Sequence, residues 1–183
     1  MKKFKQLSLS ILVASSFVVI SGSTLAASGG VVNFSGKVVN TPCGISTETA
    51  TQNITFNDIS KAHLSTDGAT SEIRDLNIDL VNCDLSAPEG SEEAFRSVTV
   101  SFTGSTNGNN NTELATVGGT GAAIVIANTG GTPLEINAAE GNQVKLDPGT
   151  NNLRYVTWVK KGTGQEVTEG DFMAVANFRL TYQ

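Results

Sequence analysis

The sequence has 183 residues, and its 12 lysines and arginines against 17 aspartates and glutamates give a formal net charge of −5 at pH 7. A chain this acidic is a poor partner for nucleic acid. Two cysteines and one histidine, His63, make a tetrahedral structural zinc site improbable.

The first segment has the features of a cleavable secretory signal. An apolar run over residues 7–20 follows three basic residues, Lys2, Lys3 and Lys5. The run is shorter than the roughly 20 residues that span a bilayer, and small residues follow it. We expect cleavage after Ala26, which leaves 157 residues with 9 basic and 17 acidic side chains, a formal charge of −8. We expect one domain in this exported part and no later membrane-spanning segment.

The exported chain opens on a strand pattern, GGVVNFSGKVV, which ends at residue 39. Its alternation places one set of residues on one face: Gly30, Val32, Phe34, Gly36 and Val38. The other face carries Val31, Asn33, Ser35 and Lys37. By itself this pattern is also compatible with an ordinary first strand paired within its own sheet.

Period-two alternation then recurs along the chain, and helical periodicity is nearly absent. Strand candidates lie around Ile54 and Phe56, around Leu76 to Leu80, around Val98 to Phe102, and at residues 122–128, 134–137, 143–146 and 153–159. Gly, Asn and Pro clusters at residues 104–112, 117–121, 128–133 and 147–152 predict turns between them. One short helical turn is expected at residues 58–64. Many short strands with frequent turns favour a sandwich or a barrel.

Cys43 and Cys83 both lie in the exported part. An even cysteine count in an oxidising compartment favours a disulfide over a metal site. A bond between them would close a loop of about 40 residues, which the chain-entropy model values at roughly 4 kcal/mol.

The last candidate, residues 171–183, alternates apolar and polar side chains almost to Gln183. A strand of this kind usually has a neighbour on each side, but no residues follow to supply one. The N-terminal segment (the head) is therefore a predicted strand with no assigned sheet. The C-terminal strand (the tail) belongs to a sheet that lacks one neighbouring strand. The head could pair with its own tail, or with the tail of the next copy, and the second arrangement gives an open filament when it does not close into a ring.

The chain resembles the major pilins of bacterial type 1 fimbriae, which are assembled by the chaperone-usher pathway. The resemblance covers essentially the full length. It rests on the secretory signal, GGVVNFSGKVVNTPC at residues 29–43, the second cysteine in LNIDLVNC, and the terminal FRLTYQ with its penultimate Tyr182.

The resemblance implies an all-β fold, an incomplete immunoglobulin-like β-sandwich that lacks its last strand, with a disulfide between Cys43 and Cys83. It divides the chain into a signal (1–26), a donor-strand extension (27–39) and a pilin domain (40–183). The donor residues would be Gly30, Val32, Phe34, Gly36 and Val38. They would enter a neighbour's groove, lined by Phe178, Leu180 and Tyr182 on one side and by the first strand after Val39 on the other.

The same resemblance implies three kinds of partner: further pilin subunits in a head-to-tail polymer, a periplasmic chaperone that also grips the carboxylate of Gln183, and an outer-membrane usher. The chain would pass through the periplasm to a fimbria on the cell surface and contribute to cell adhesion, with no cofactor.

Two alternatives stay open from the sequence. The chain could be a minor or adaptor subunit of the same family, or a self-contained secreted β-sandwich that binds a ligand. An enzyme is disfavoured, because His63 lies in a polar stretch without a nucleophile motif, and GGTG at residues 118–121 does not lead from a strand into a helix as a phosphate-binding loop does.

Overall fold

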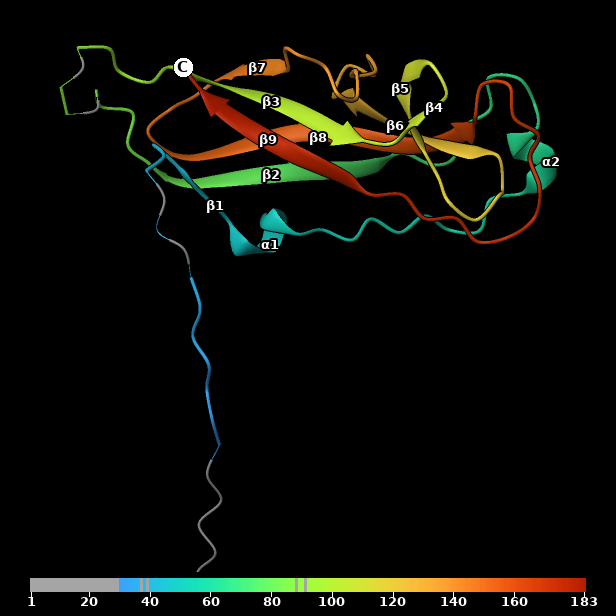
Figure 1. Ribbon diagram of the computed structural model, residues 1–183, viewed down its shortest axis with the longest axis horizontal. Coiled ribbons are helices and arrows are strands. Elements are labelled where there is room, and N and C mark those ends of the chain that lie inside the picture. The colour runs from blue at the N-terminus through green and yellow to red at the C-terminus, as the bar shows by residue number, and fades with distance from the viewer. Residues whose placement is uncertain (1–29, 37, 39, 88, 91) are drawn as a thin grey trace, which may run out of the picture. The chain divides into compact units, whose positions relative to one another are not determined.

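The computed structural model describes residues 30–36, 38, 40–87, 89, 90 and 92–183 (Figure 1). The expected signal segment lies outside these residues. The chain divides into two units, one ending at Val38 and one from Val39 to Gln183. Each unit is described by itself below.

The second unit is built almost entirely of strands. Nine strands and two short helices occur in its described part, in the order β1 (Gly44–Ile45), α1 (Thr47–Ala50), α2 (Lys61–Leu64), β2 (Arg74–Cys83), β3 (Ser97–Gly104), β4 (Thr106–Asn107), β5 (Asn110–Ala115), β6 (Ala122–Asn128), β7 (Asn142–Lys145), β8 (Gly149–Lys161) and β9 (Ala176–Tyr182). In these described residues no helix is long and apolar enough to cross a membrane.

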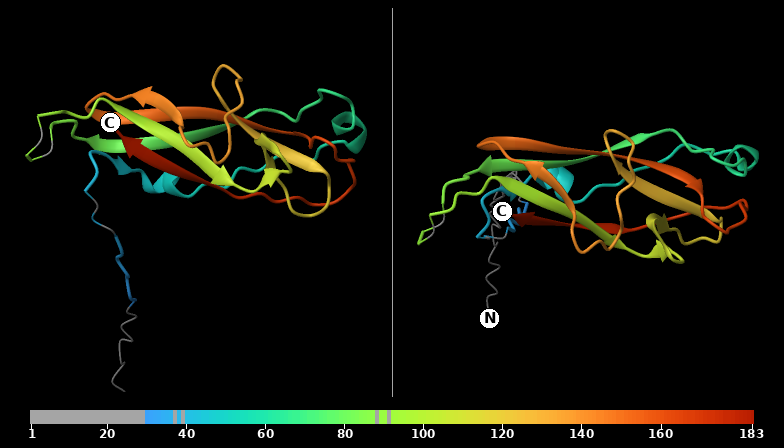
Figure 2. Two further views of the ribbon diagram at one scale, coloured as in Figure 1. Left: turned by 45° about the horizontal axis from the view of Figure 1, so that its top comes forward. Right: turned by 90° about the horizontal axis from the view of Figure 1, so that it is seen from above.

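The strands form two sheets that pack face to face, as the views in Figures 1 and 2 show. One sheet has six strands in the order β1-β2-β8-β6-β5-β4, and the other has three in the order β7-β3-β9. Every pair of neighbouring strands is antiparallel. The sequence expectation of a β-sandwich is confirmed.

The core lies between the sheets and follows the alternation of the sequence. Ile78 and Leu80 of β2 are fully buried, as are Val98 and Val100 of β3. Tyr155 of β8 is 1% exposed, and its ring lies edge-on to that of Phe102 with centroids 5.2 Å apart. Burial of alternate residues on the inner faces is the main source of stability in a sandwich of this kind.

Most predicted strands are confirmed as β2, β3, β6, β7, β8 and β9. The strand expected around Ile54 and Phe56 is wrong. Alternate residues there are half-buried, but the main chain has no partner strand. The strand expected at residues 134–137 is also wrong, because Ile136 contributes only an isolated bridge to Phe102.

The turn expected at residues 104–112 is only partly right. Thr106 and Asn107 form β4, and β5 begins at Asn110, so the cluster is a tight hairpin whose arms join the six-stranded sheet. Gly108 supplies the positive φ of 58° between the two arms. The sequence did not predict these two arms as strands, because their residues are mostly polar and show little hydrophobic alternation.

The predicted helical turn is confirmed as α2, which Ser60 caps by accepting a hydrogen bond from the His63 N–H. The sequence did not predict α1, which Ser46 caps. The predicted disulfide is present and joins Cys43, next to β1, to Cys83 at the end of β2. It fixes the first strand of the domain to the sheet.

Candidate functional site: an open groove beside the last strand

The last strand, β9, is an edge strand. Among the described residues it pairs only with β3, from Val98↔Tyr182 to Gly104↔Ala176. Its other edge therefore presents main-chain N–H and C=O groups without a strand partner, and such an edge is a template for strand addition. The missing neighbour expected from the sequence corresponds to this edge.

A groove of about 600 Å³ runs along that edge. One wall is the segment that leads into β9, from Ala174 to Phe178. The other wall is the chain from Thr49 to Phe56, which includes the end of α1. The floor consists of core side chains from both sheets: Leu76, Phe102, Leu114, Ile124 and Ile126. The groove thus reaches down to the sandwich core, although Phe102, Leu114 and Ile126 on its floor are only 3–4% exposed.

A second hollow of about 460 Å³ has Ile54 and Phe56 in common with the groove. Its apolar lining includes Ile59, Leu64, Val167 and Phe172. The rings of Phe56 and Phe172 are tilted by 41° to each other, with centroids 6.4 Å apart. Because the two hollows have residues in common, they form one elongated groove with an apolar floor.

The groove walls are held by polar contacts to the sheet. The side-chain amide of Gln52 donates to the main-chain oxygens of Thr49 (3.0 Å) and Asn77 (2.7 Å), and Thr49 Oγ1 accepts from the Asp79 N–H at 2.9 Å. These hydrogen bonds hold the irregular wall against β2, although the wall residues form no strand ladder with it. The wall is therefore positioned, and its main chain at residues 51–56 belongs to no strand.

The structure places the predicted acceptor residues on the inner face of β9. Phe178 lines the groove, and Leu180 and Tyr182 are half-buried against the main core cluster. Burial raises the pKa of Tyr182, whose ring packs edge-on against Phe95. The opposite wall was expected to be a strand, but it is the short β1, α1 and an irregular segment.

Gln183 is exposed, and its main-chain oxygen accepts hydrogen bonds from the N–H groups of Arg96 (2.7 Å) and Ser97 (3.0 Å). Its side-chain oxygen accepts a further bond from the Gln143 amide. The end of the chain is thereby fixed on the three-stranded sheet.

In the first unit, the structure assigns residues 30–36 and 38 to no strand. Val32, Phe34 and Val38 are 73%, 92% and 101% exposed, and nothing lies within 4 Å of where a Cβ on Gly30 or Gly36 would be. Several large apolar side chains exposed close together are typical of an interaction site. All five predicted donor residues are thus solvent-exposed in the isolated chain.

Sequence reasoning missed the groove floor. Ile124 and Ile126 were recognised as strand residues, but their place in the groove depends on which neighbouring strand is absent. Their alternation with Ala123, Val125 and Ala127 was the available signal, and it assigns a face rather than a neighbour.

A polar cluster lies away from the groove, around the buried carboxylate of Glu113 on β5. Lys160 Nζ lies 2.7 Å from Oε1, and Asn107 Nδ2 donates to Oε2 at 2.7 Å. The N–H and the hydroxyl of Thr163 also donate to this carboxylate. Burial raises the pKa of Glu113, but these hydrogen bonds outweigh it and lower the pKa to about 2.

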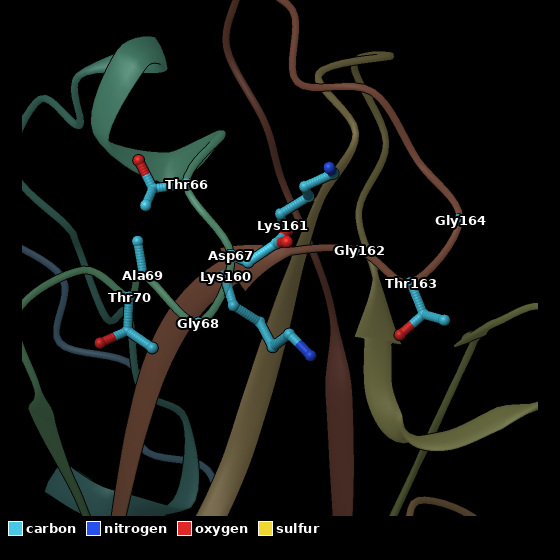
Figure 3. A pocket seen from close by; sticks show the side chains of 10 residues that line it. All are labelled: Thr66, Asp67, Gly68, Ala69, Thr70, Lys160, Lys161, Gly162, Thr163 and Gly164. Atoms are coloured by element: carbon cyan, nitrogen blue, oxygen red, sulfur yellow. The ribbon is translucent and has the colours of Figure 1, made fainter.

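A third hollow, of about 400 Å³, lies beside this cluster and is shown in Figure 3. Its lining includes Lys160 and Lys161, which suggests an anion site at first sight. Figure 3 shows the two ammonium groups pointing in different directions, and Lys160 is already paired with Glu113. The described residues also contain no group of three or more His, Cys, Asp or Glu side chains that could hold a metal ion.

The comparisons with known proteins agree with this geometry. The model of the fimbrial protein family matches residues 32–183. The chain belongs to the fimbrial protein family. It is 44% identical to the Pap fimbrial major pilin protein of Escherichia coli over 147 residues, 79% of this chain and 78% of the relative. It is 42% identical to KS71A fimbrillin of Escherichia coli, again over 79% of each chain.

Solved structures of the family superpose on this fimbrial subunit. The P pilus rod subunit PapA matches with a TM-score of 0.70 and 42% identity, over 78% of this chain and all of PapA. A subunit in the structure of a chaperone-usher pilus matches with a TM-score of 0.77 and 42% identity, over 87% of this chain and 99% of that one. The chain is accordingly a structural subunit of a cell-surface fimbria and not an enzyme.

Proposed function

We propose that this fimbrial subunit builds the rod of its fimbria by strand exchange between copies. Residues 27–39 of one copy form the donor, and residues 40–183 of the next form the acceptor domain. The observation that carries this proposal is the open apolar groove beside β9, in a chain whose exposed head has alternate apolar residues. A heterologous contact of this kind propagates into a filament.

The dimensions of donor and edge agree. Val32 and Val38 are six residues apart, as are the ends of β9, Ala176 and Tyr182. At roughly 3.3 Å per residue, each segment extends for about 20 Å. An inserted donor can therefore pair along the whole of β9. The other edge of the inserted donor would then lie next to the irregular wall at residues 51–56 and could pair with it.

The energetics favour a long-lived joint. Burial of Val32, Phe34 and Val38 contributes about 5 to 9 kcal/mol, at roughly 1.5 to 3 kcal/mol for each side chain. Main-chain hydrogen bonds add about 0.5 to 1.5 kcal/mol apiece, and ordering the head costs about 1 to 2 kcal/mol per residue. Because the donor completes a core, its release resembles unfolding and is slow.

Before assembly, the open groove requires a temporary occupant. An uncovered apolar edge aggregates, and strand addition by a chaperone is a known solution for pilins. We therefore include a periplasmic chaperone and an outer-membrane usher as partners of this chain. One of the similar solved structures is of a chaperone-usher pilus, which supports this assignment.

The rod, rather than an adaptor position, is favoured by the relatives. The Pap protein is named a major pilin, and PapA is named a rod subunit. Quantification of this chain in purified fimbriae separates a major subunit from a minor one. A self-contained ligand-binding sandwich is the competing function from the sequence, and it requires a complete fold in the monomer.

The experiment compares two forms of the exported chain. One is residues 27–183. The other lacks residues 27–39 and carries a flexible linker and a copy of residues 28–39 after Gln183. A matched control has the same linker and copy, but with Phe34→Asp in the copied strand. Thermal unfolding and size-exclusion chromatography are the measurements.

We expect the form with the appended strand to be monomeric and to unfold at a much higher temperature than both of the others. The control should lose most of that gain, because a carboxylate would enter the groove at the phenylalanine position. Equal stability of all three forms would contradict the proposal and favour the self-contained module.

A further inference from the structure

Three large apolar side chains near the start of β9 are exposed. Val117, Met173 and Val175 are 68%, 68% and 72% exposed. Val117 and Met173 are bridged by two main-chain hydrogen bonds of 2.8 and 3.1 Å, and Val175 follows two residues after Met173. We call these three residues the outer patch. It lies at the start of β9, where Val175 also borders the groove.

The outer patch differs from the rest of the same face. Further along β9 the side chains that alternate with the inward Phe178 and Leu180 are polar: Asn177, Arg179 and Thr181. Solvent alone would favour polar residues throughout. A contiguous apolar group at one end of an otherwise polar strand face indicates a contact.

The main-chain directions of β9 show where a donor would lie. Gln183 exchanges hydrogen bonds with Ser97 of β3, so the odd-numbered residues direct their N–H and C=O groups toward β3. The even-numbered residues direct theirs to the open edge. Every neighbouring strand pair in this domain is antiparallel, and we take the donor to pair in the same sense.

Side-chain size selects the register. Gly36 has no side chain and fits opposite Phe178, the largest side chain of β9 that lines the groove. Val32 then lies opposite Tyr182 and Val38 opposite Ala176, where the groove is open. On the outer face, the alternation of the sequence would then put Lys37 opposite Asn177 and Val39 opposite Val175. Sliding the donor by two residues moves Val39 to Met173, so both registers bring it to the outer patch.

We propose that the outer patch is the docking site for Val39 of a second copy of this chain, so that the donor is held on both of its faces. This inference rests on the proposed strand exchange. Val39 lies outside the described residues, and its part is argued from its position in the alternating sequence. Residue pairs between hydrogen-bonded rungs, such as 39 with 175, have the closer side chains in an antiparallel ladder.

The contact also explains why the apolar residues gather at this end. The acceptor-bound donor runs antiparallel to β9, so its last residues reach the beginning of that strand. The second unit of the donating copy begins at Val39 itself. The outer patch therefore fixes the point at which one subunit leaves the groove of the next.

The test is a double-mutant cycle on purified fimbriae made from the full chain with its own assembly partners. The first cycle uses Val39→Thr, Val175→Thr and the two together. A second cycle, for the register shifted by two residues, uses Met173→Thr in place of Val175→Thr. Threonine keeps the shape and strand preference of valine. The measurement is the rate at which subunits leave the fibre in urea. The matched control is Val31→Thr, on the same donor face at its other end.

One cross-strand pair contributes about 0.2 to 1 kcal/mol, so each single substitution should raise the dissociation rate up to about five-fold. In one of the two cycles, Val39→Thr with Val175→Thr or Val39→Thr with Met173→Thr, the double variant should dissociate no faster than the faster of its two single variants. Val31→Thr combined with Val175→Thr should be additive. If the effects on the dissociation rate are additive in both cycles, the inference is overturned.

A further variant, Phe34→Asp, separates failure of this inference from failure of the proposed function. If Phe34→Asp still gives normal fibres, strand exchange itself is wrong. If it prevents fibres while the cycle is additive, only the outer patch assignment is wrong. A fall in periplasmic subunit level for Val175→Thr, with an unchanged dissociation rate, would assign the patch to another partner and also overturn the inference.

Discussion

Glu113 and Lys160 form an ion pair between β5 and β8 in which the carboxylate is 1% exposed and the lysine side chain 35% exposed. The carboxylate also receives hydrogen bonds from Asn107 of β4 and from Thr163 beyond β8. One side chain thus connects the β4–β5 hairpin to the start of the loop that leads to β9.

This cluster predicts a specific pH dependence. The pKa of Glu113 is lowered to about 2 in the folded chain, so its stabilisation is fully present above the unfolded pKa of about 4.5. It is lost as the pH falls through the folded value. We expect Glu113→Gln to reduce the free energy of unfolding by about 2 to 3 kcal/mol at pH 7, with little loss near pH 2. Urea unfolding of the exported chain at pH 7, 4 and 2 measures this.

Glu135→Gln is the matched control, because Glu135 is exposed in the described structure. The control should change stability by less than about 0.5 kcal/mol at each pH. An equal effect of Glu113→Gln at pH 7 and pH 2 would show that its role is packing rather than charge.

The donor face predicts opposite results for two adjacent residues. Phe34→Asp puts a charge on the face that enters the groove, so fibres should not form and subunits should accumulate in the periplasm or be degraded. Asn33→Asp adds the same charge on the outward face, and fibres should assemble. Electron microscopy and subunit release from the cell surface are the measurements. Normal fibres from both variants would contradict the donor assignment.

The sequence predicted the buried faces of the strands better than it predicted the groove. Alternation assigned inner faces correctly in β2, β3 and β9, because each strand buries one face whatever its neighbour is. It failed at Ile54 and Phe56, where the same alternation occurs without a partner strand. A strand needs a neighbouring strand for its hydrogen bonds, and the sequence of one segment does not say whether such a neighbour is present.

The same limit applies to the groove floor. The alternation identifies Ile124 and Ile126 as inward residues of a strand, and only the position of β9 at the sheet edge places them on the groove floor. The groove depends on the fold bringing together residues that are 50 or more positions apart, such as Ile124 and Phe178, which both line it.

The disulfide is expected to stabilise the domain chiefly through its long loop. Cys43 and Cys83 are 40 positions apart, and closure of such a loop is worth about 4 kcal/mol on the chain-entropy model. Replacement of both cysteines by alanine should lower the free energy of unfolding by about this amount. Urea unfolding with and without reductant measures it. The alanine variant should be insensitive to reductant, and an equal response of both proteins would contradict the assignment.

The approach to β9 depends on a close contact at Gly118. Its φ is 111°, and a methyl group there would overlap the main-chain carbonyl of Asp171. The neighbouring chain is fixed by hydrogen bonds from the Thr168 N–H to Thr120 and from the Met173 N–H to Val117. Gly118→Ala should therefore displace the segment that forms one groove wall, and destabilise the domain by more than about 2 kcal/mol.

Gly119 provides the control for backbone strain alone. Its φ of 72° also disfavours alanine, but nothing lies within 4 Å of the added methyl group. Gly119→Ala should cost only about 1 kcal/mol. Urea unfolding gives both values, and fibre dissociation rates should follow the same order, since a displaced wall narrows or opens the groove. Equal costs for the two variants would mean that φ, and not the contact with Asp171, determines this part of the groove wall.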